Sequence, residues 1–261
     1  MKRLICLLLL LSVFRLDAAL TVTSRGGMFS NTSNTTLAGS PSGTMSVGNL
    51  GVLVCSYTNA GAGGNNDVFT QATFNDSVGN TWTRQLDTMY DPGAALAGAE
   101  VAVYTAPILT QITVTDTVTL TTSTSQAGKT ARFIEVSGLN GVPTVVTSGS
   151  ISDQLTSGQT GTAVSMTTGS IANNDAVICW AAFRNATLPT GDSDTTNGSW
   201  SAIVGTSASA PMMCATQNKV VTATGTQTWD ITLAASVAWQ SAWIEIAEAV
   251  AGSQSTTNGF F

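Results

Sequence analysis

Two glutamates occupy matching positions in this chain, and their spacing is the first pattern that could do chemistry. Glu135 follows Phe133 by two residues, and Glu245 follows Trp243 by two residues. Because side chains alternate along a strand, each glutamate would share a sheet face with its aromatic neighbour. Two carboxyl groups about 5 Å apart are the catalytic pair of a retaining glycoside hydrolase. A solvated position or an ion pair with a nearby arginine also explains the glutamates, and duplication alone would place them at matching positions. We therefore predict no enzyme and keep the hydrolase as an alternative.

Tryptophan is a second residue type that could bind a ligand. An exposed indole ring stacks on sugars, whereas a buried one fills a sandwich core. Trp82, Trp200 and Trp243 lie at aromatic positions that recur in both halves of the chain, which favours the core. Trp229 and Trp239 occur only in the second half, so they are the better candidates for a glycan-binding platform. A carbohydrate-binding module or lectin is therefore another alternative function.

A loop rich in side-chain oxygens suggests a cation site. Asp192, Asp194 and Asn197 lie close together and are followed by Gly198. Calcium prefers clustered carboxylate, amide and carbonyl oxygens, although the spacing here does not fit the EF-hand pattern. An Asn-Gly hairpin turn with aspartate caps accounts for the same residues. We predict no cofactor and retain Ca²⁺ as the alternative.

Composition excludes several classes of protein. The 261 residues contain no histidine, which removes His-based triads and His metal ligands. Charged residues make up only 9% of the chain, and the formal net charge is −6. A nucleic-acid partner would need clustered Lys and Arg, so none is predicted. Ser and Thr make up about a quarter of the residues.

The N-terminal segment has the features of a secretory signal peptide. Met1, Lys2 and Arg3 form a basic start, Leu4–Phe14 is apolar, and Ala18 and Ala19 are small residues suited to cleavage. The apolar run is shorter than the roughly 20 residues needed to span a bilayer. We therefore predict residues 1–19 to be a signal peptide and the protein to be secreted or displayed on a surface, with no membrane span in the mature chain.

Cysteine usage leaves the redox state open. The chain beyond residue 19 keeps three cysteines, Cys55, Cys179 and Cys214. One disulfide with a spare thiol is compatible with an oxidising compartment. Three buried thiols are the other interpretation, because Cys55 and Cys179 end apolar runs typical of buried strands.

The chain reads as an internal duplication. Four collinear pairs of segments match: 46–55 with 170–179, 76–82 with 194–200, 116–120 with 229–233, and 131–136 with 242–246. The first pair is offset by 124 residues, since 170 − 46 = 124. We predict β-sandwich halves at 20–140 and 141–250, followed by a polar tail at 251–261. Whether they form one sandwich or two closely packed lobes stays open.

Each half has the pattern of an antiparallel β-protein. Residues 114–121 alternate between Thr and the residues Val114, Asp116, Val118 and Leu120, which predicts a half-buried strand. Threonine suits such strands because its branched Cβ fits a pleated surface. Gly- and Asn-rich links separate the strand-like segments. The predicted fold is an all-β antiparallel β-sandwich or jelly roll built from two similar halves.

Several short motifs carry a resemblance to a known group. The turn Asp76-Ser77-Val78-Gly79-Asn80-Thr81-Trp82, the strand 116–120 and the strand end 135–138 resemble a loose group of exported bacterial and phage-encoded β-sandwich proteins of cell or virion surfaces. The resemblance covers about residues 46–140 well and the second half weakly. It implies a jelly-roll-like fold and surface display, with sugar binding in some relatives, and it implies no catalytic residue.

These observations favour a non-catalytic extracellular protein that is structural or adhesive. Its sheets have few charges to protect their edges from pairing with other sheets. The predicted partners are a second copy or another surface protein, with a glycan as an alternative. The N-terminal strand with Leu20 and Val22 could extend a neighbour's sheet, and Phe260 and Phe261 could dock into a neighbouring subunit.

Overall fold

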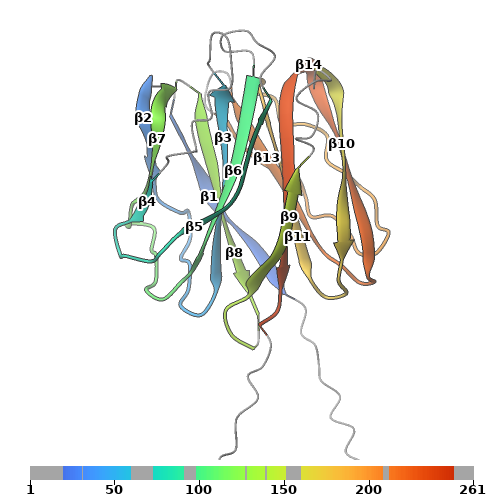
Figure 1. Cartoon of the computed structure of the whole chain (residues 1–261), viewed down its shortest axis with the longest axis horizontal. Coiled ribbons are helices and arrows are strands. Elements are labelled where there is room, and N and C mark those ends of the chain that lie inside the picture. The colour runs from blue at the N-terminus through green and yellow to red at the C-terminus, as the bar shows by residue number, and fades with distance from the viewer. Residues whose placement is uncertain are drawn as a thin grey trace, which may run out of the picture.

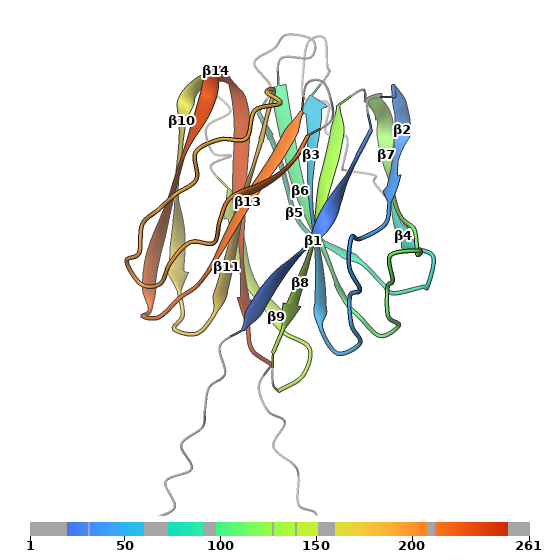
Figure 2. The ribbon, with the colours of Figure 1, turned by 180° about the vertical axis from the view of Figure 1, so that it is seen from behind.

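The computed structural model describes residues 20–30, 32–59, 73–90, 98–126, 128–138, 140–150, 160–207 and 212–249. Within these ranges every extended regular element is a β-strand, and paired strands run antiparallel (Figures 1 and 2). The predicted all-β, antiparallel sandwich class is confirmed. No helix in this described part of the chain is long and apolar enough to cross a membrane.

The first half of the chain forms two facing sheets. The larger sheet has five strands in the order β1-β8-β3-β6-β5, and the smaller has three in the order β2-β7-β4. The strands of these two sheets are β1 (Thr21–Ser30), β2 (Asn34–Gly39), β3 (Leu50–Asn59), β4 (Thr73–Asp76), β5 (Thr83–Tyr90), β6 (Gly98–Pro107), β7 (Val118–Gln126) and β8 (Lys129–Ser137).

The second half repeats this arrangement with one fused strand. Its main sheet runs β9-β14-β11-β13-β12, and β10 pairs with the first part of β14. The second part of β14 lies between β9 and β11. The strands are β9 (Thr144–Ser150), β10 (Thr160–Ile171), β11 (Ala176–Phe183), β12 (Val204–Ser207), β13 (Met213–Val220) and β14 (Gly225–Ala247).

The two main sheets have the same strand order when β9, β14, β11, β13 and β12 are set against β1, β8, β3, β6 and β5. The 23-residue β14 therefore occupies the places of both β7 and β8. A shared order is what a duplication predicts. A common origin of the two halves itself stays a prediction.

Three hydrophobic cores hold the sheets in four successive layers. The two main sheets pack against each other through the central core, which includes Val52 and Val54 of β3 and Ile178 and Trp180 of β11. A second core lies between the first main sheet and β2, β4 and β7, and a third lies between the second main sheet and β10 with the start of β14. Figures 1 and 2 show β2, β4 and β7 at one end of the molecule and β10 at the other.

Burial on both faces explains the apolar runs of the central strands. Every residue of β11 is buried, as are residues 50–58 of β3. A strand covered on both sides reads as a continuous apolar run and not as an alternation. The threonine-rich alternation belongs instead to the outer sheets, which have one face in solvent.

One predicted strand begins later than its alternation suggests. Val118 and Leu120 are buried as expected, but β7 starts only at Val118. Val114 is 54% exposed in a preceding turn. The turn forms because Asp116 Oδ2 accepts hydrogen bonds from the backbone N–H and the hydroxyl of Thr113, both at 2.7 Å. This local capping outcompetes the strand pattern.

The strand registers correct the first sequence match between the halves. Gly51 lies opposite Glu135, and Val177 lies opposite Glu245, so the equivalent positions differ by 177 − 51 = 126 residues and not by 124. Two turn bonds agree: Gly48 N donates to Ile108 O, and Asn174 N donates to Val221 O. With this offset Cys179 corresponds to Leu53, so the shared Cys is not a shared position.

Cys55, Cys179 and Cys214, the cysteines within the described ranges, are free and buried. Burial raises the pKa of the thiols of Cys55, Cys179 and Cys214. Of the two interpretations left open by the sequence, the structure has the three buried thiols.

Candidate functional site

Glu135 lies on β8 and is fully engaged in hydrogen bonds. Its neighbours Ile134 and Val136 point into the central core, so Glu135 points the other way, toward the outer layer. Arg25 Nε donates to Oε2 at 2.7 Å, and a second guanidinium nitrogen contacts the same oxygen. Ser46 N and Asn49 Nδ2 each donate to Oε1 at 2.6 Å. Hydrogen bonds with a charged donor or acceptor are stronger than those between neutral groups.

Glu245 has the equivalent position on β14 but different partners. Ala172 N, which corresponds to Ser46 N, donates to Oε1 at 3.0 Å. Asp175 stands where the first half has Asn49, and its carboxyl group hydrogen-bonds to Glu245. Burial, this hydrogen bond and the charge of Glu245 together raise the pKa of Asp175 to about 7. Below about pH 7 the Asp175 carboxyl group therefore carries the proton of this hydrogen bond.

The structure does not bring Glu135 and Glu245 together. Glu135 shares its sheet face with Phe133 of the second core, and Glu245 shares its face with Trp243 of the third core. The two main sheets lie between them, and stacked sheets are about 10 Å apart. Neither arrangement leaves the pair flanking one bond of a substrate, so the geometry gives the hydrolase alternative no support.

The two tryptophans predicted as a platform are buried. Trp229 is 0% exposed and Trp239 is 5% exposed, and both belong to the third core. Trp229 Nε1 donates to Gln217 Oε1 at 2.9 Å, which satisfies its polar atom inside the protein. The expected exposed position is wrong for both, because the second half fills its outer core with aromatic rings.

The loop with Asp192, Asp194 and Asn197 is organised as a set of turns. Asp192 accepts hydrogen bonds from the backbone N–H groups of Asp194 and Asp230, at 2.7 and 2.8 Å. Asp194 Oδ1 accepts from Thr196 N at 3.0 Å, and Asn197 has a φ of 56°. Across the described ranges no three His, Cys, Asp or Glu residues gather as a metal site. Calcium stays a prediction, and the observed bonds are those of a turn.

Two residues of β13 connect this loop to the sheet through hydrogen bonds. The Gln217 side chain bonds to Asp192 N and, through Nε2, to the carbonyls of Asp192 and Ser201. Lys219 is 1% exposed and donates to Thr196 O at 2.8 Å, with its ammonium 4.8 Å from the centre of the Trp200 ring. Lys219 is thus a basic residue that binds groups inside the protein.

The N-terminal residues predicted to reach a neighbour are used within the chain. Leu20 is 3% exposed in the central core, and Val22 packs against the same core. β1 pairs with β8 along its length, with Val22 opposite Val136. The strand is therefore paired on one side, and its apolar side chains contribute to the central core. It is also the edge strand of its sheet, so extension of a neighbour's sheet stays a prediction. Phe260 and Phe261 and the segment 1–19 lie outside the described residues.

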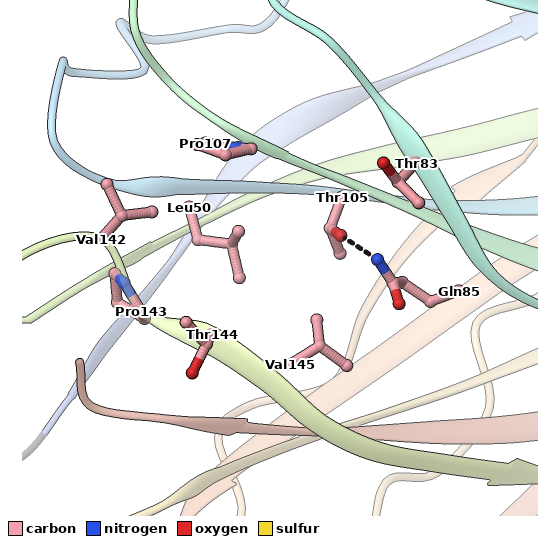
Figure 3. A pocket seen from close by; sticks show the side chains of 9 residues that line it. All are labelled: Leu50, Thr83, Gln85, Thr105, Pro107, Val142, Pro143, Thr144 and Val145. Atoms are coloured by element: carbon pink, nitrogen blue, oxygen red, sulfur yellow. Dashed lines mark hydrogen bonds between the residues drawn. The ribbon is translucent and has the colours of Figure 1, made fainter. Parts of the chain in front are cut away.

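A pocket of about 360 Å³ lies where the two halves meet (Figure 3). Strands β5 and β6 form one side and the link into β9 forms the other. Its lining carries no charge, and Gln85 Nε2 donates to Thr105 Oγ1 at 2.7 Å across one wall. The lining residues are Leu50, Thr83, Gln85, Thr105, Pro107, Val142, Pro143, Thr144 and Val145.

The outermost ribbon of the second half presents an uncharged edge. β10 has twelve residues, none of them charged, and forms the end of its sheet. Its exposed side chains include Ala163, Ser165 and Thr167, which lie opposite Thr232, Asp230 and Thr228 of β14. We call these six residues the outer threonine face. Natural edge strands are often protected by charged side chains, and β10 has none.

Arg25, Asn49, Asp175 and Lys129 were missed as important residues. They lie far along the chain from the side chains that they contact, so no local motif marks them. One feature of the sequence could have marked the basic residues among them. The chain has only nine Lys and Arg, and several of these occur within apolar segments.

Comparisons with protein-family models, with curated proteins and with solved structures find no match to this chain.

Proposed function

We propose that this is a non-catalytic, extracellular structural or adhesive protein that associates through its outer sheet edges. The observation that carries the proposal is the uncharged edge strand β10 with the outer threonine face beside it. An unprotected edge offers backbone N–H and C=O groups to another strand, and a second copy of the chain supplies a complementary edge.

The buried polar groups support the non-catalytic part of the proposal. Glu135 is neutralised by Arg25, and the Asp192 carboxylate caps backbone N–H groups. Catalytic acids and bases need to face a substrate, whereas these groups face other parts of the same chain. Their role is to join distant segments of a rigid sandwich.

The four-layered packing supports a structural role. The central strands are buried on both faces, and the two halves share one continuous apolar core. Such a core resists local opening because its backbone hydrogen bonds are reached only by large unfolding events. Rigidity of this kind suits a surface protein that is exposed to solvent and proteases.

The test is the assembly state of the protein lacking its predicted signal peptide, followed by size-exclusion chromatography and electron microscopy. The wild type is expected to form oligomers or filaments. The double variant Ser165→Lys/Thr167→Lys adds charge to the edge strand and is expected to give monomers.

The matched control places one lysine on the opposite end of the molecule, at Thr119 of the central strand β7. Thr119→Lys leaves the β10 edge unchanged and is expected to assemble as the wild type does. A wild type that stays monomeric at all concentrations, or an edge variant that assembles normally, would contradict the proposal.

A further inference from the structure

Lys129 is a buried lysine whose ammonium group lies on an asparagine side chain. It opens β8 and is 0% exposed. Its Nζ donates to Asn34 Oδ1 at 2.7 Å, to Asn34 O at 2.9 Å and to Thr32 O at 2.7 Å. Lysine is rarely fully buried, so the oxygens around Lys129 Nζ hold it at a defined position.

The geometry brings the lysine nitrogen within reach of the amide carbon. Nζ lies 2.7 Å from Oδ1, and a C=O bond is about 1.23 Å, so Nζ and Cγ of Asn34 are at most about 3.9 Å apart. Reacting atoms in a productive arrangement are typically about 3–3.5 Å apart. A small side-chain rotation therefore reaches the attacking position.

The carbonyl of Asn34 is already held by a second donor. Thr36 N donates to Asn34 Oδ1 at 3.1 Å. A fixed backbone N–H of this kind stabilises the negative charge that develops on the oxygen when a nucleophile attacks the carbonyl carbon. The amide is thereby activated by the same turn that begins β2.

Lys129 shares its sheet face with two further buried polar residues, Tyr57 and Glu100. Lys129 lies opposite Tyr57 of β3, and Tyr57 lies opposite Glu100 of β6, so these side chains are successive neighbours on one sheet face. Tyr57 and Glu100 are at most 1% exposed. Desolvation in this setting lowers the pKa of Lys129, which raises the share of neutral, nucleophilic amine.

We propose that Lys129 Nζ and Asn34 Cγ form an intramolecular amide bond, an isopeptide cross-link between β8 and β2. Nζ donates three hydrogen bonds and is an ammonium group in this arrangement, so it first gives one proton to water. The lone pair of the resulting amine attacks Cγ, and the bond from Cγ to the asparagine side-chain nitrogen breaks. That nitrogen takes a second proton from Nζ and leaves as ammonia. The step needs no oxidant or cofactor, and the exposed position of Asn34 lets ammonia escape.

Lys219 provides an internal comparison. It is also buried, but its closest acceptor is the carbonyl of Thr196 at 2.8 Å, and Gln227 Oε1 is 3.3 Å away. The carboxylate of Asp194 lies 3.9 Å from its ammonium group. Lys219 thus bonds mainly to a loop carbonyl, and its nearest side-chain amide oxygen is 3.3 Å away, against 2.7 Å for Lys129.

The experiment is mass spectrometry of the full chain after prolonged incubation at neutral pH. The expected intact mass is about 17 Da below the sequence mass, for loss of ammonia, after allowance for any cleaved leader. A protease digest is expected to contain one branched peptide joining residues 34 and 129. Lys129→Arg and Asn34→Ala should abolish both signals, and Lys219→Arg should retain them.

A further readout separates the chemistry from folding. Asn34→Ala keeps Lys129 and its contacts with the backbone carbonyls, so its circular dichroism should match the wild type while the mass deficit disappears. A folded wild type with its full sequence mass, or a branched peptide at another pair of residues, overturns the proposal.

Discussion

In the first half of the chain Glu135 lies opposite Gly51, and in the second half Glu245 lies opposite Val177. The backbone arrangements match: Glu135 accepts a hydrogen bond from Ser46 N, and Glu245 accepts one from the equivalent Ala172 N. The side chains differ: Arg25 and Asn49 bond to Glu135, whereas Asp175, whose pKa is raised to about 7, hydrogen-bonds to Glu245. One fold therefore holds an equivalent buried glutamate with two different sets of partners, and the partner in the second half titrates near neutral pH.

Removing the cation of the first site should have the largest effect. Arg25→Ala leaves Glu135 as a buried carboxylate without its cation, which costs about 2–4 kcal/mol in the free energy of unfolding at pH 7. Urea denaturation measures this difference. Arg84→Ala is the matched control, because the pair Arg84–Asp87 is more exposed and should contribute less than about 1 kcal/mol. Equal losses in the two variants would show that Glu135 does not need Arg25.

The second site should make stability depend on pH. The folded pKa of Asp175 is about 7 against an ordinary value of 3.8, so the folded state binds the extra proton between these values. The stability that Asp175 contributes is therefore fully present below about pH 4, is lost as the pH rises to about 7, and does not change above that. Because Asp175 is partly exposed, the total loss is discounted to about 1–2 kcal/mol.

Asp175→Asn should remove that pH dependence, since the amide would donate to Glu245 as Asn49 does to Glu135. Unfolding free energies measured at pH 5 and pH 8 should then differ less than in the wild type. The prediction would be contradicted if the wild type were more stable at pH 8 than at pH 5 and the variant showed the same difference.

Exchanging the partner in the other direction should have the smallest effect. Asn49→Asp places a second acid beside Glu135, but Arg25 offsets part of the repulsion. We expect a loss of about 1 kcal/mol at pH 7 that is recovered on acidification to pH 5. Thermal unfolding at the two pH values measures it, and a pH-independent loss would assign the effect to packing instead.

The sequence allowed the fold class to be predicted because apolar runs and Thr alternation report burial strand by strand. The equivalence of Glu135 and Glu245 was also readable, since each follows an aromatic residue in a similar strand. Their partners were not readable: Arg25 reaches Glu135 across 110 residues of sequence, and only the pairing of β1 with β8 brings them together.

Exposure was the property that the sequence predicted least well. Trp229 occupies the buried side of its strand because β14 faces the third core there, and nothing in its local sequence distinguishes this from an exposed ring. The offset between the halves failed for a similar reason. Matching Cys55 with Cys179 satisfied residue type, whereas the turn geometry at Gly48 and Asn174 fixes the register.

The burial of the basic residues has a consequence for survival outside a cell. Beyond residue 19 the chain has six Lys and Arg, and Lys129, Arg132 and Lys219 are at most 6% exposed. Arg25 is covered in part and held by Glu135. Proteases that cut after Lys or Arg need an accessible, extended segment at the cut, which leaves Arg84 and Arg184 as the sites to attack. A trypsin-like enzyme should therefore digest the folded protein slowly and yield few, large fragments.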